Sequence, residues 1–494
     1  MLSLIALIGL VQSGVDRVPL EGNPLFNDLG QYWKDQMPVY GVTGFTIAAI
    51  KDGKVVLLDG VGVADPLSGK AADIDTRYYI ASITKTMTGV AIAQLAEQGK
   101  VDLDAPVQKY LPRFTLADAD YAKSVTIRDL LSHRKGIKDS GVTQLDAYTG
   151  EVTEDRYYTM LGRVMPTKEV GYSNIDFTLL GRVIESVTGK SWKDYLSENV
   201  FAPIGMNRTT AYLAPCLSDA NLAAPIVIGR SGPEPSQVMK TDRTMHAAGG
   251  VMSTTRDLTK YALGFLNGGV SEDRRFLKES SVADAFAHQS TTPQSGSIRK
   301  LSGYGYAWSV GDYRDIKGFV AHSGGYTGYN AYIAMVPSKG VGIVVLTNTG
   351  GSGEGFCTVI AVDMLDRLLG YPIDEGVRKA YSTQVQEVMA KQKDLKPIGP
   401  NPAVSGMLSA MPSQYVGTFS NSLYGDIVVS LSGGNLRMDW GDLPILLKST
   451  VMDEFTGHQD ITDLRGVRGK FLVSNGKCQA VELQMAQAVR FDRK

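Results

Sequence analysis

Ser82-Ile83-Thr84-Lys85 decides the fold, because a long apolar-periodic run begins here. Ile83, Met87, Val90, Ala91 and Leu95 recur at helical spacing, and the run stops at Gly99, which predicts a helix with a glycine C-terminal cap. Ser82 and Lys85 would then lie one turn apart on the same face. Three further S-x-x-K matches open no such run; they begin at Ser132, Ser297 and Ser474.

The pairing of Ser82 with Lys85 predicts a nucleophile and its base. A serine hydroxyl attacks well only when a neighbouring base takes its proton. A lysine amine can be that base when burial or a nearby cation lowers its pKa. The N–H groups at the helix start also suit a developing oxyanion. The alternative for this motif alone is a helix that starts with serine and carries an exposed lysine.

A second motif, Tyr172-Ser173-Asn174, precedes another helical run over residues 177–184. The chain has 23 tyrosines, yet Y-x-N occurs only here. A loop tyrosine beside two amines can be partly deprotonated and relay a proton to a leaving group, and an asparagine amide can hold a substrate carbonyl and a lysine at once. The alternative is a plain turn, which Gly, Ser and Asn favour.

The third element is His322-Ser323-Gly324-Gly325, which leads into strand-like runs at 332–337 and 342–348. Pro337-Ser338-Lys339-Gly340 between them predicts a hairpin turn. A Gly-Gly strand lets a substrate backbone approach and pair along the sheet edge. We therefore expect Gly324 and Gly325 to bind substrate, with the N–H of Gly325 as the second oxyanion donor beside that of Ser82.

In this order, the three elements resemble the serine β-lactamase and penicillin-binding-protein superfamily. The likeness is to the branch that holds class C β-lactamases, family VIII carboxylesterases, D-aminopeptidases and D-Ala-D-Ala carboxypeptidases. It runs over roughly residues 27–369 and includes flanking phrases at 126–133, 202–206 and 248–254. The family's S-x-x-K falls on Ser82 and Lys85, and its Y-x-N falls on Tyr172 and Asn174.

The resemblance implies a serine hydrolase that cleaves an ester or amide bond through an acyl-enzyme on Ser82, without a metal or other cofactor. Lys85 and Tyr172 would share the serine proton, and Tyr172 would protonate the leaving group. Asn174 would hold the substrate carbonyl. A non-catalytic member that binds peptidoglycan-type ligands or acts in assembly is the alternative.

One position departs from the β-lactamase pattern: His322-Ser323-Gly324 stands where those enzymes carry K-T-G. Their lysine supplies a fixed positive charge for the β-lactam carboxylate, whereas a histidine is charged only below about pH 6.5 unless its environment shifts it. This position looks more like the D-aminopeptidase and esterase-like members. We expect His322 to tune Tyr172 or to meet a substrate carboxylate; the alternative is a hydrogen-bonded strand histidine without a chemical duty.

Composition limits the partners. With 50 Lys+Arg against 51 Asp+Glu and no basic stripe, we expect no nucleic acid, and a small-molecule or peptide substrate instead. The five histidines show no metal-ligand spacing, so we expect no metal. We also expect no integral membrane span, because the apolar run at 2–11 is too short. That run resembles a secretory signal core without its charged leader, or else it is a short buried segment. A signal at 1–20 would make the enzyme periplasmic or secreted, with a cytoplasmic location as the alternative.

The strand and helix patterns predict an α/β fold for residues 21–370. Strand-like runs at 44–50 and 54–60 flank Asp52-Gly53, a hairpin signal. Together with the strands after His322 they would form one antiparallel sheet, built from both ends of the domain. The sheet would be flanked by helices with a helical subdomain, as in the β-lactamase/transpeptidase-like fold. Residues 139–167 and 206–242 are polar and weakly periodic, and we expect them to fold over the cleft.

After residue 370 the composition and the pattern of the sequence change. Residues 371–404 read as a helical and Pro-rich linker. Residues 405–494 hold short strand-like runs separated by turns, which predict a small antiparallel β-barrel. It resembles the lipocalin-like domain appended to some family members. It would bind a small apolar ligand, wall the active site or mediate oligomerisation; the alternative is a stabilising appendage.

Overall fold

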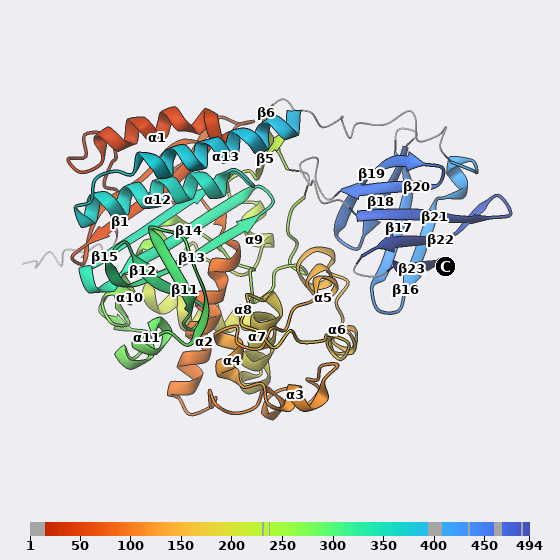
Figure 1. Cartoon of the computed structure of the whole chain (residues 1–494), viewed down its shortest axis with the longest axis horizontal. Coiled ribbons are helices and arrows are strands. Elements are labelled where there is room, and N and C mark those ends of the chain that lie inside the picture. The colour runs from red at the N-terminus through yellow and green to blue at the C-terminus, as the bar shows by residue number, and fades with distance from the viewer. Residues whose placement is uncertain are drawn as a thin grey trace, which may run out of the picture.

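The computed structural model describes two bodies along the chain, an α/β domain and a β-barrel (Figure 1). The described residues are 15–229, 232–236, 238–393, 408–432, 435–458, 467–485 and 488–494. Most of the expected signal segment at 1–20, and the Pro-rich part of the expected linker at 394–404, lie outside them.

An antiparallel sheet forms the centre of the α/β domain, and its described strands follow the order β10-β11-β12-β13-β14-β15-β1-β2-β3. Their bounds are β1 Gly44–Lys51, β2 Lys54–Asp65, β3 Lys70–Ala71, β10 Ser290–Ser295, β11 Arg299–Tyr304, β12 Ser309–Tyr313, β13 Ile316–Tyr326, β14 Tyr329–Val336 and β15 Val341–Thr347. Because β1 pairs with β15, the two ends of the domain meet in one sheet, as predicted. Asp52 and Gly53 both have positive φ (51° and 73°), the conformation that a type I′ hairpin turn requires.

Each face of the sheet is covered by its own layer of helices. Helices α1 (Asn27–Tyr40), α12 (Gly353–Leu369) and α13 (Glu375–Lys393) lie on one face, and α2 (Thr84–Glu97) with the other helices lies on the opposite face (Figure 1). Since strand side chains alternate, Ile47 joins the core under α12 while Ala48 joins the core around α2. β14 and β15 are buried along their whole length, as expected for strands between two helical layers.

The helical side of the domain is built around α2, which is buried from Thr84 to Leu95. Gly99 follows it with φ +69°, in the role predicted for a cap. The other elements are α3 Ala119–Lys123, α4 Ile127–Leu131, α5 Ser140–Gln144, α6 Glu154–Leu161, α7 Asn174–Thr188, α8 Trp192–Leu196, α9 Ala214–Leu217, α10 Thr255–Leu266 and α11 Glu279–Phe286, with the strand pairs β4 Tyr78–Tyr79/β7 Met252–Ser253, β5 Ile226–Gly229/β6 Gly232–Pro235 and β8 Val270–Ser271/β9 Arg274–Arg275. In the part of the chain that is described, no helix is both long and apolar enough to cross a bilayer.

The two polar segments predicted to fold over the cleft contain short elements. Residues 139–167 hold α5, a π-helical turn (Leu145–Thr149) and α6, and residues 206–242 hold α9 and the β5–β6 pair. Elements of four to eight residues are too short to establish a clear period, which explains the weak sequence signal.

The second body is a closed antiparallel barrel, as predicted. Its described strands are β16 Gly417–Asn421, β17 Gly425–Ser432, β18 Asn435–Trp440, β19 Leu443–Val451, β20 Glu454–His458, β21 Val467–Ser474, β22 Lys477–Gln484 and β23 Ala488–Arg493. β16 pairs with β23 and closes the ring. Buried aromatic side chains fill the interior, with Trp440 and Phe491 at 5.7 Å between ring centroids. The lipocalin-like resemblance stays a prediction.

The barrel docks on the helical side of the α/β domain. The backbone N–H of Asp442 donates to Thr149 O at 2.7 Å, and the Asp442 carboxylate accepts from Arg243 Nε at 3.1 Å. Tyr424 lies against Gly141, where an added Cβ would come within 3.1 Å of the tyrosine. The barrel therefore contacts α5 and the π-helical turn at 145–149. Of the expected linker, residues Glu375–Lys393 form α13, which is packed in the layer with α12.

Candidate active site

Ser82 lies in a 3₁₀ turn, Ala81–Ile83, which leads directly into α2. Residues three apart nearly eclipse at such a turn, and Lys85 Nζ is 3.1 Å from Ser82 Oγ. The shared face predicted for the two side chains is therefore present. Ala81 has φ +45°, which is uncommon for a residue with a side chain. Such strained backbone conformations persist where the surrounding structure fixes them, and they cluster at active sites.

Lys85 is fully buried (0 % exposed), and its amine contacts three oxygens. These are Ser82 Oγ at 3.1 Å, Asn174 Oδ1 at 2.8 Å and Ala248 O at 2.6 Å. Burial lowers the pKa of Lys85 well below its usual range, against the attraction of Asp176. A neutral amine has two N–H groups and one lone pair.

The partners of Lys85 decide where that lone pair points. Asn174 Oδ1 and Ala248 O can only accept, so they take both N–H groups of the neutral amine. The lone pair then faces Ser82 Oγ, and the serine hydroxyl donates to the amine. This is the arrangement of a nucleophile with its base.

The Tyr172 hydroxyl donates to Ser82 Oγ at 2.6 Å, and its ring lies 4.6 Å from Lys85 Nζ. Although 36 % of the residue is exposed, burial around the hydroxyl raises the pKa of Tyr172 above its usual range. The tyrosine is therefore protonated at neutral pH, unlike the partly deprotonated group that the motif suggested. Tyr172, Ser82 and Lys85 form one chain of hydrogen bonds running from acid to base.

Two buried side chains hold the Tyr172-Ser173-Asn174 segment from behind. The His133 ring lies 5.0 Å from the Tyr172 ring, and His133 Nδ1 is 2.7 Å from Asp176 Oδ2. Burial raises the pKa of Asp176 and lowers that of His133, so both favour their neutral forms. In the sequence, His133 stood out only as part of a phrase that resembles the family, and Asp176 was not identified. The two residues are 43 positions apart, so no local pattern links them.

Gly324 lets β13 approach the nucleophile turn. A Cβ at this position would lie 2.1 Å from Ile80 O and 3.2 Å from Ser82 N, so only glycine fits. Gly325 follows it and is exposed. The strand thus runs beside the backbone of Ser82, where two N–H groups can meet an oxyanion.

His322 is buried on the same strand, with its ring centroid 6.3 Å from that of Tyr172. Its Nδ1 donates to Ser323 O at 2.6 Å, since a carbonyl only accepts, and Nε2 is left with a lone pair. Burial, and then the Lys85 amine, lower the pKa of His322 to about 3. His322 is therefore neutral at physiological pH. This favours the expected role beside Tyr172 over that of a cation for a substrate carboxylate.

A second buried lysine borders the site and was missed from the sequence. Lys240 Nζ lies 4.4 Å from the centroid of the Tyr326 ring, 5.1 Å from Tyr148 and 5.7 Å from Tyr79. Tyr326 comes directly after Gly325 in β13. We call this group the Lys240 box; it consists of Lys240, Tyr79, Tyr148 and Tyr326. No local motif predicts it, because its members come from four distant segments.

The remaining sequence candidates have structural roles or lie elsewhere. The Ser132 hydroxyl donates to Arg128 O, Lys135 lies 3.5 Å from Asp129, and Ser297 and Ser474 are exposed. Within the described ranges, no group of three or more His, Cys, Asp or Glu side chains is placed to hold a metal ion.

Comparison with known proteins gives matches over most of the chain. The family model described as Beta-lactamase matches residues 29–364. Penicillin-binding protein 4 of Amycolatopsis lactamdurans is 28 % identical over 358 residues, which cover 70 % of this chain and 91 % of that protein. Unguisins hydrolase ungD' of Aspergillus campestris is 26 % identical over 426 residues, 83 % of this chain and 78 % of its own.

Solved structures share the fold. The octameric penicillin-binding protein homologue from Pyrococcus abyssi aligns with a TM-score of 0.60 at 23 % identity, covering 94 % of this chain and 99 % of its own. D-amino acid amidase from Ochrobactrum anthropi SV3 aligns with a TM-score of 0.57 at 23 % identity, covering 72 % and 99 %. The first covers the barrel as well as the α/β domain.

Proposed function

The chain belongs to the Beta-lactamase family of serine hydrolases, and from this premise we propose that it cleaves an ester or amide bond through an acyl-enzyme on Ser82. One observation carries the proposal: the chain of hydrogen bonds from Tyr172 through Ser82 to Lys85. It joins a proton donor, a nucleophile and a base whose lone pair is directed at the nucleophile.

In the proposed acylation, Ser82 Oγ attacks the carbonyl carbon while Lys85 takes the serine proton. The tetrahedral oxyanion lies between the N–H groups of Ser82 and Gly325. Tyr172 then gives its proton to the leaving group and recovers one from Lys85, so that both end as they began. Asn174 accepts a hydrogen bond from Lys85 through its Oδ1. Its side-chain NH₂ group can therefore donate a hydrogen bond to a carbonyl oxygen of the substrate.

In the proposed deacylation, the same two groups act on water. Lys85 takes a proton from the water as it attacks the acyl carbonyl, while the protonated Tyr172 helps to orient the water, and Lys85 returns the proton to Ser82 Oγ as the ester bond breaks. The products are the free acid and the restored serine. In the free protein, Ser82 Oγ already lies 3.1 Å from Lys85 Nζ and 2.6 Å from the Tyr172 hydroxyl.

The neutral His322 supports esters and D-amino-acid amides or peptides as substrates ahead of β-lactams. It stands where β-lactamases carry a lysine, and it offers no cation to a β-lactam carboxylate. The likeness to a D-amino acid amidase and to a penicillin-binding protein suggests D-amino-acid amides and peptides as the first substrates to test. We propose slow turnover of β-lactams and faster turnover of an ester or a D-amino-acid amide.

Intact-mass spectrometry tests the acyl-enzyme. The protein is incubated in parallel with p-nitrophenyl butyrate, nitrocefin and a D-Ala-D-Ala peptide, and product release is followed alongside. We expect an acyl adduct on the Ser82 peptide, lost in Ser82→Ala and kept in Ser297→Ala, whose serine heads an exposed S-x-x-K.

The outcomes separate the proposals. An adduct that persists in Ser82→Ala would show that another residue is the nucleophile. Neither adduct nor turnover with any substrate would favour the non-catalytic alternative, in which the cleft binds a peptidoglycan-type ligand.

A further inference from the structure

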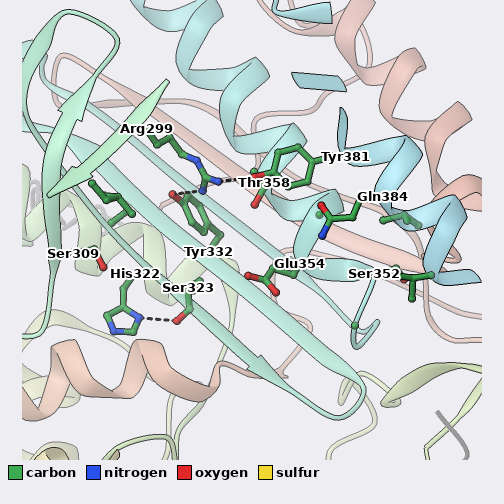
Figure 2. A pocket seen from close by; sticks show the side chains of 16 residues that line it. Arg299, Ser309, His322, Ser323, Tyr332, Ser352, Glu354, Thr358, Tyr381 and Gln384 are labelled. Carbon is green, nitrogen blue, oxygen red and sulfur yellow. Dashed lines mark hydrogen bonds between the residues drawn. The ribbon is translucent and has the colours of Figure 1, made fainter. Parts of the chain in front are cut away.

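A cavity lies between strands β11–β14 and helices α12 and α13, mainly on the face of the sheet opposite Ser82 (Figure 2). Its wall residues Ala321 and Tyr332 belong to the core shared with α12, whereas their neighbours Val320 and Ile333 belong to the core around α2. The cavity has a volume of about 620 Å³. This is within the usual range of small-molecule sites, roughly 300–1,000 Å³.

Arg299 is the charged group of this cavity. Its guanidinium donates to the Tyr332 hydroxyl at 2.9 Å and to the Tyr381 hydroxyl at 3.0 Å. The guanidinium carbon lies 5.4 Å from the centroid of the Tyr332 ring. Two of its five N–H donors are used in this way, and three remain. Neutral hydroxyls orient the guanidinium but leave its charge uncompensated.

Other arginines in the same layer have a buried carboxylate of their own. Arg314 pairs with Asp366 through contacts of 2.7 and 2.6 Å, and Arg378 pairs with Asp363 through contacts of 3.1 and 2.9 Å. For Arg299, no carboxylate belonging to the described residues lies within ion-pair distance. An arginine stays charged at any physiological pH, and a half-buried cation is costly without an anion. Of these three arginines, Arg299 is therefore the one without a carboxylate partner among the described residues.

The rest of the cavity restricts which anion fits. Val385 is buried and Val388 is 39 % exposed, and both line the wall formed by α13. Glu354, in the first turn of α12, lines another part of the wall (Figure 2). Its carboxylate would repel a ligand with a second negative charge. The two valine side chains and the remaining guanidinium donors together suit an organic monoanion.

We propose that this cavity binds a small organic carboxylate, with its carboxylate on Arg299 and its apolar body against Val385 and Val388. A planar guanidinium with free donors takes a carboxylate through two parallel hydrogen bonds. The Arg299 end of the cavity lies across the sheet from Ser82, whereas His322, the neighbour of Tyr172, borders the cavity at its other end. The test of the proposed site needs no turnover.

Calorimetric titration of full-length Ser82→Ala protein tests the site without interference from acylation. The ligands are hexanoate, the neutral hexanamide and the dianion adipate. We expect hexanoate to bind one site, and both hexanamide and adipate to bind at least about tenfold more weakly, since a charge-assisted hydrogen-bond pair is lost or a repulsion is added.

Three variants locate the binding. Arg299→Gln should weaken hexanoate at least about tenfold, whereas Arg437→Gln, which removes an exposed arginine of the barrel, should leave it unchanged. Val388→Glu changes an exposed side chain and should fold normally, and its negative charge at the wall should also weaken hexanoate. Absence of hexanoate binding, or equal affinity in all three variants, would overturn the proposal.

Discussion

Lys85 and Lys240 are both buried, one beside Ser82 and the other beside Tyr326 of β13, but their surroundings suit them to different tasks. Lys85 is 0 % exposed and Lys240 is 6 % exposed, and burial lowers the pKa of both, that of Lys240 to about 7. The oxygens around Lys85 include the hydroxyl of Ser82. Lys240 instead donates to the carbonyls of Ala147 and Thr244.

The difference shows that burial alone does not make a lysine a base. A neutral amine acts as a base when a hydroxyl group faces its lone pair, as the Ser82 hydroxyl does for Lys85. The rings of the Lys240 box attract the charged form through their π faces. We interpret Lys85 as the base and Lys240 as a support for the segment that carries Tyr148 and for Tyr326.

The largest expected effect comes from replacing Lys85. Lys85→Met and Lys85→Arg should each lower kcat at least about 1,000-fold, as the loss of one member of a nucleophile–base unit does. The arginine keeps the charge but cannot give up its proton. Steady-state kinetics on the best substrate, with Lys240→Met as the matched buried-lysine control, measures the effect. Comparable activity in Lys85→Arg would rule out a base at this position.

Tyr172→Phe should follow, with a loss of about 100-fold or more in kcat for an amide, because general acid catalysis contributes about that much. A p-nitrophenyl ester should lose less, since its leaving group departs without a proton. The ratio of the two losses is therefore the measurement. Equal losses for both substrates would contradict a role for Tyr172 in protonating the leaving group.

The pH profile separates Lys85 from His322. Lys85 acts as a base only when neutral, so kcat/KM should rise as pH increases through its lowered pKa. His322, with a pKa of about 3, stays neutral at physiological pH. The acidic limb should therefore keep its position in His322→Gln, even if the rate itself falls. A limb that moves or disappears in this variant would assign it to His322.

Lys240→Met should have the smallest effect on turnover, less than about tenfold, because no proton transfer involves it. Its signature is in stability instead. The pKa of Lys240 is about 7 in the folded protein and an ordinary 10.5 when exposed, so between these values the unfolded chain binds more protons. The free energy of unfolding of the wild type should then rise with pH, relative to the variant, from about pH 7 to pH 10.

Urea denaturation at several pH values in this window checks that prediction. Parallel pH dependences in the wild type and Lys240→Met would show that the folded-state pKa of Lys240 is not lowered.

Local chemistry made much of the architecture predictable. Asp52-Gly53 specifies its hairpin through residues that tolerate positive φ, and the spacing of Ser82 and Lys85 places them on one face of a turn. The barrel could be predicted from its short strand-like runs and the turns between them. The fit of Gly324 against Ile80 was not, since it depends on how closely two distant segments approach.

By itself, the sequence determined which groups could react and which local elements carry them, because propensity, turn chemistry and period act over a few residues. Only the tertiary structure decided the protonation states. Lys85 is made a base by the carbonyl of Ala248 and the amide of Asn174, and His322 is kept neutral by burial. Desolvation and long-range hydrogen bonds act between residues far apart in the chain, and no local pattern records them. The same holds for Arg299. Only the tertiary structure shows that it contacts tyrosine hydroxyls, whereas Arg314 pairs with a carboxylate.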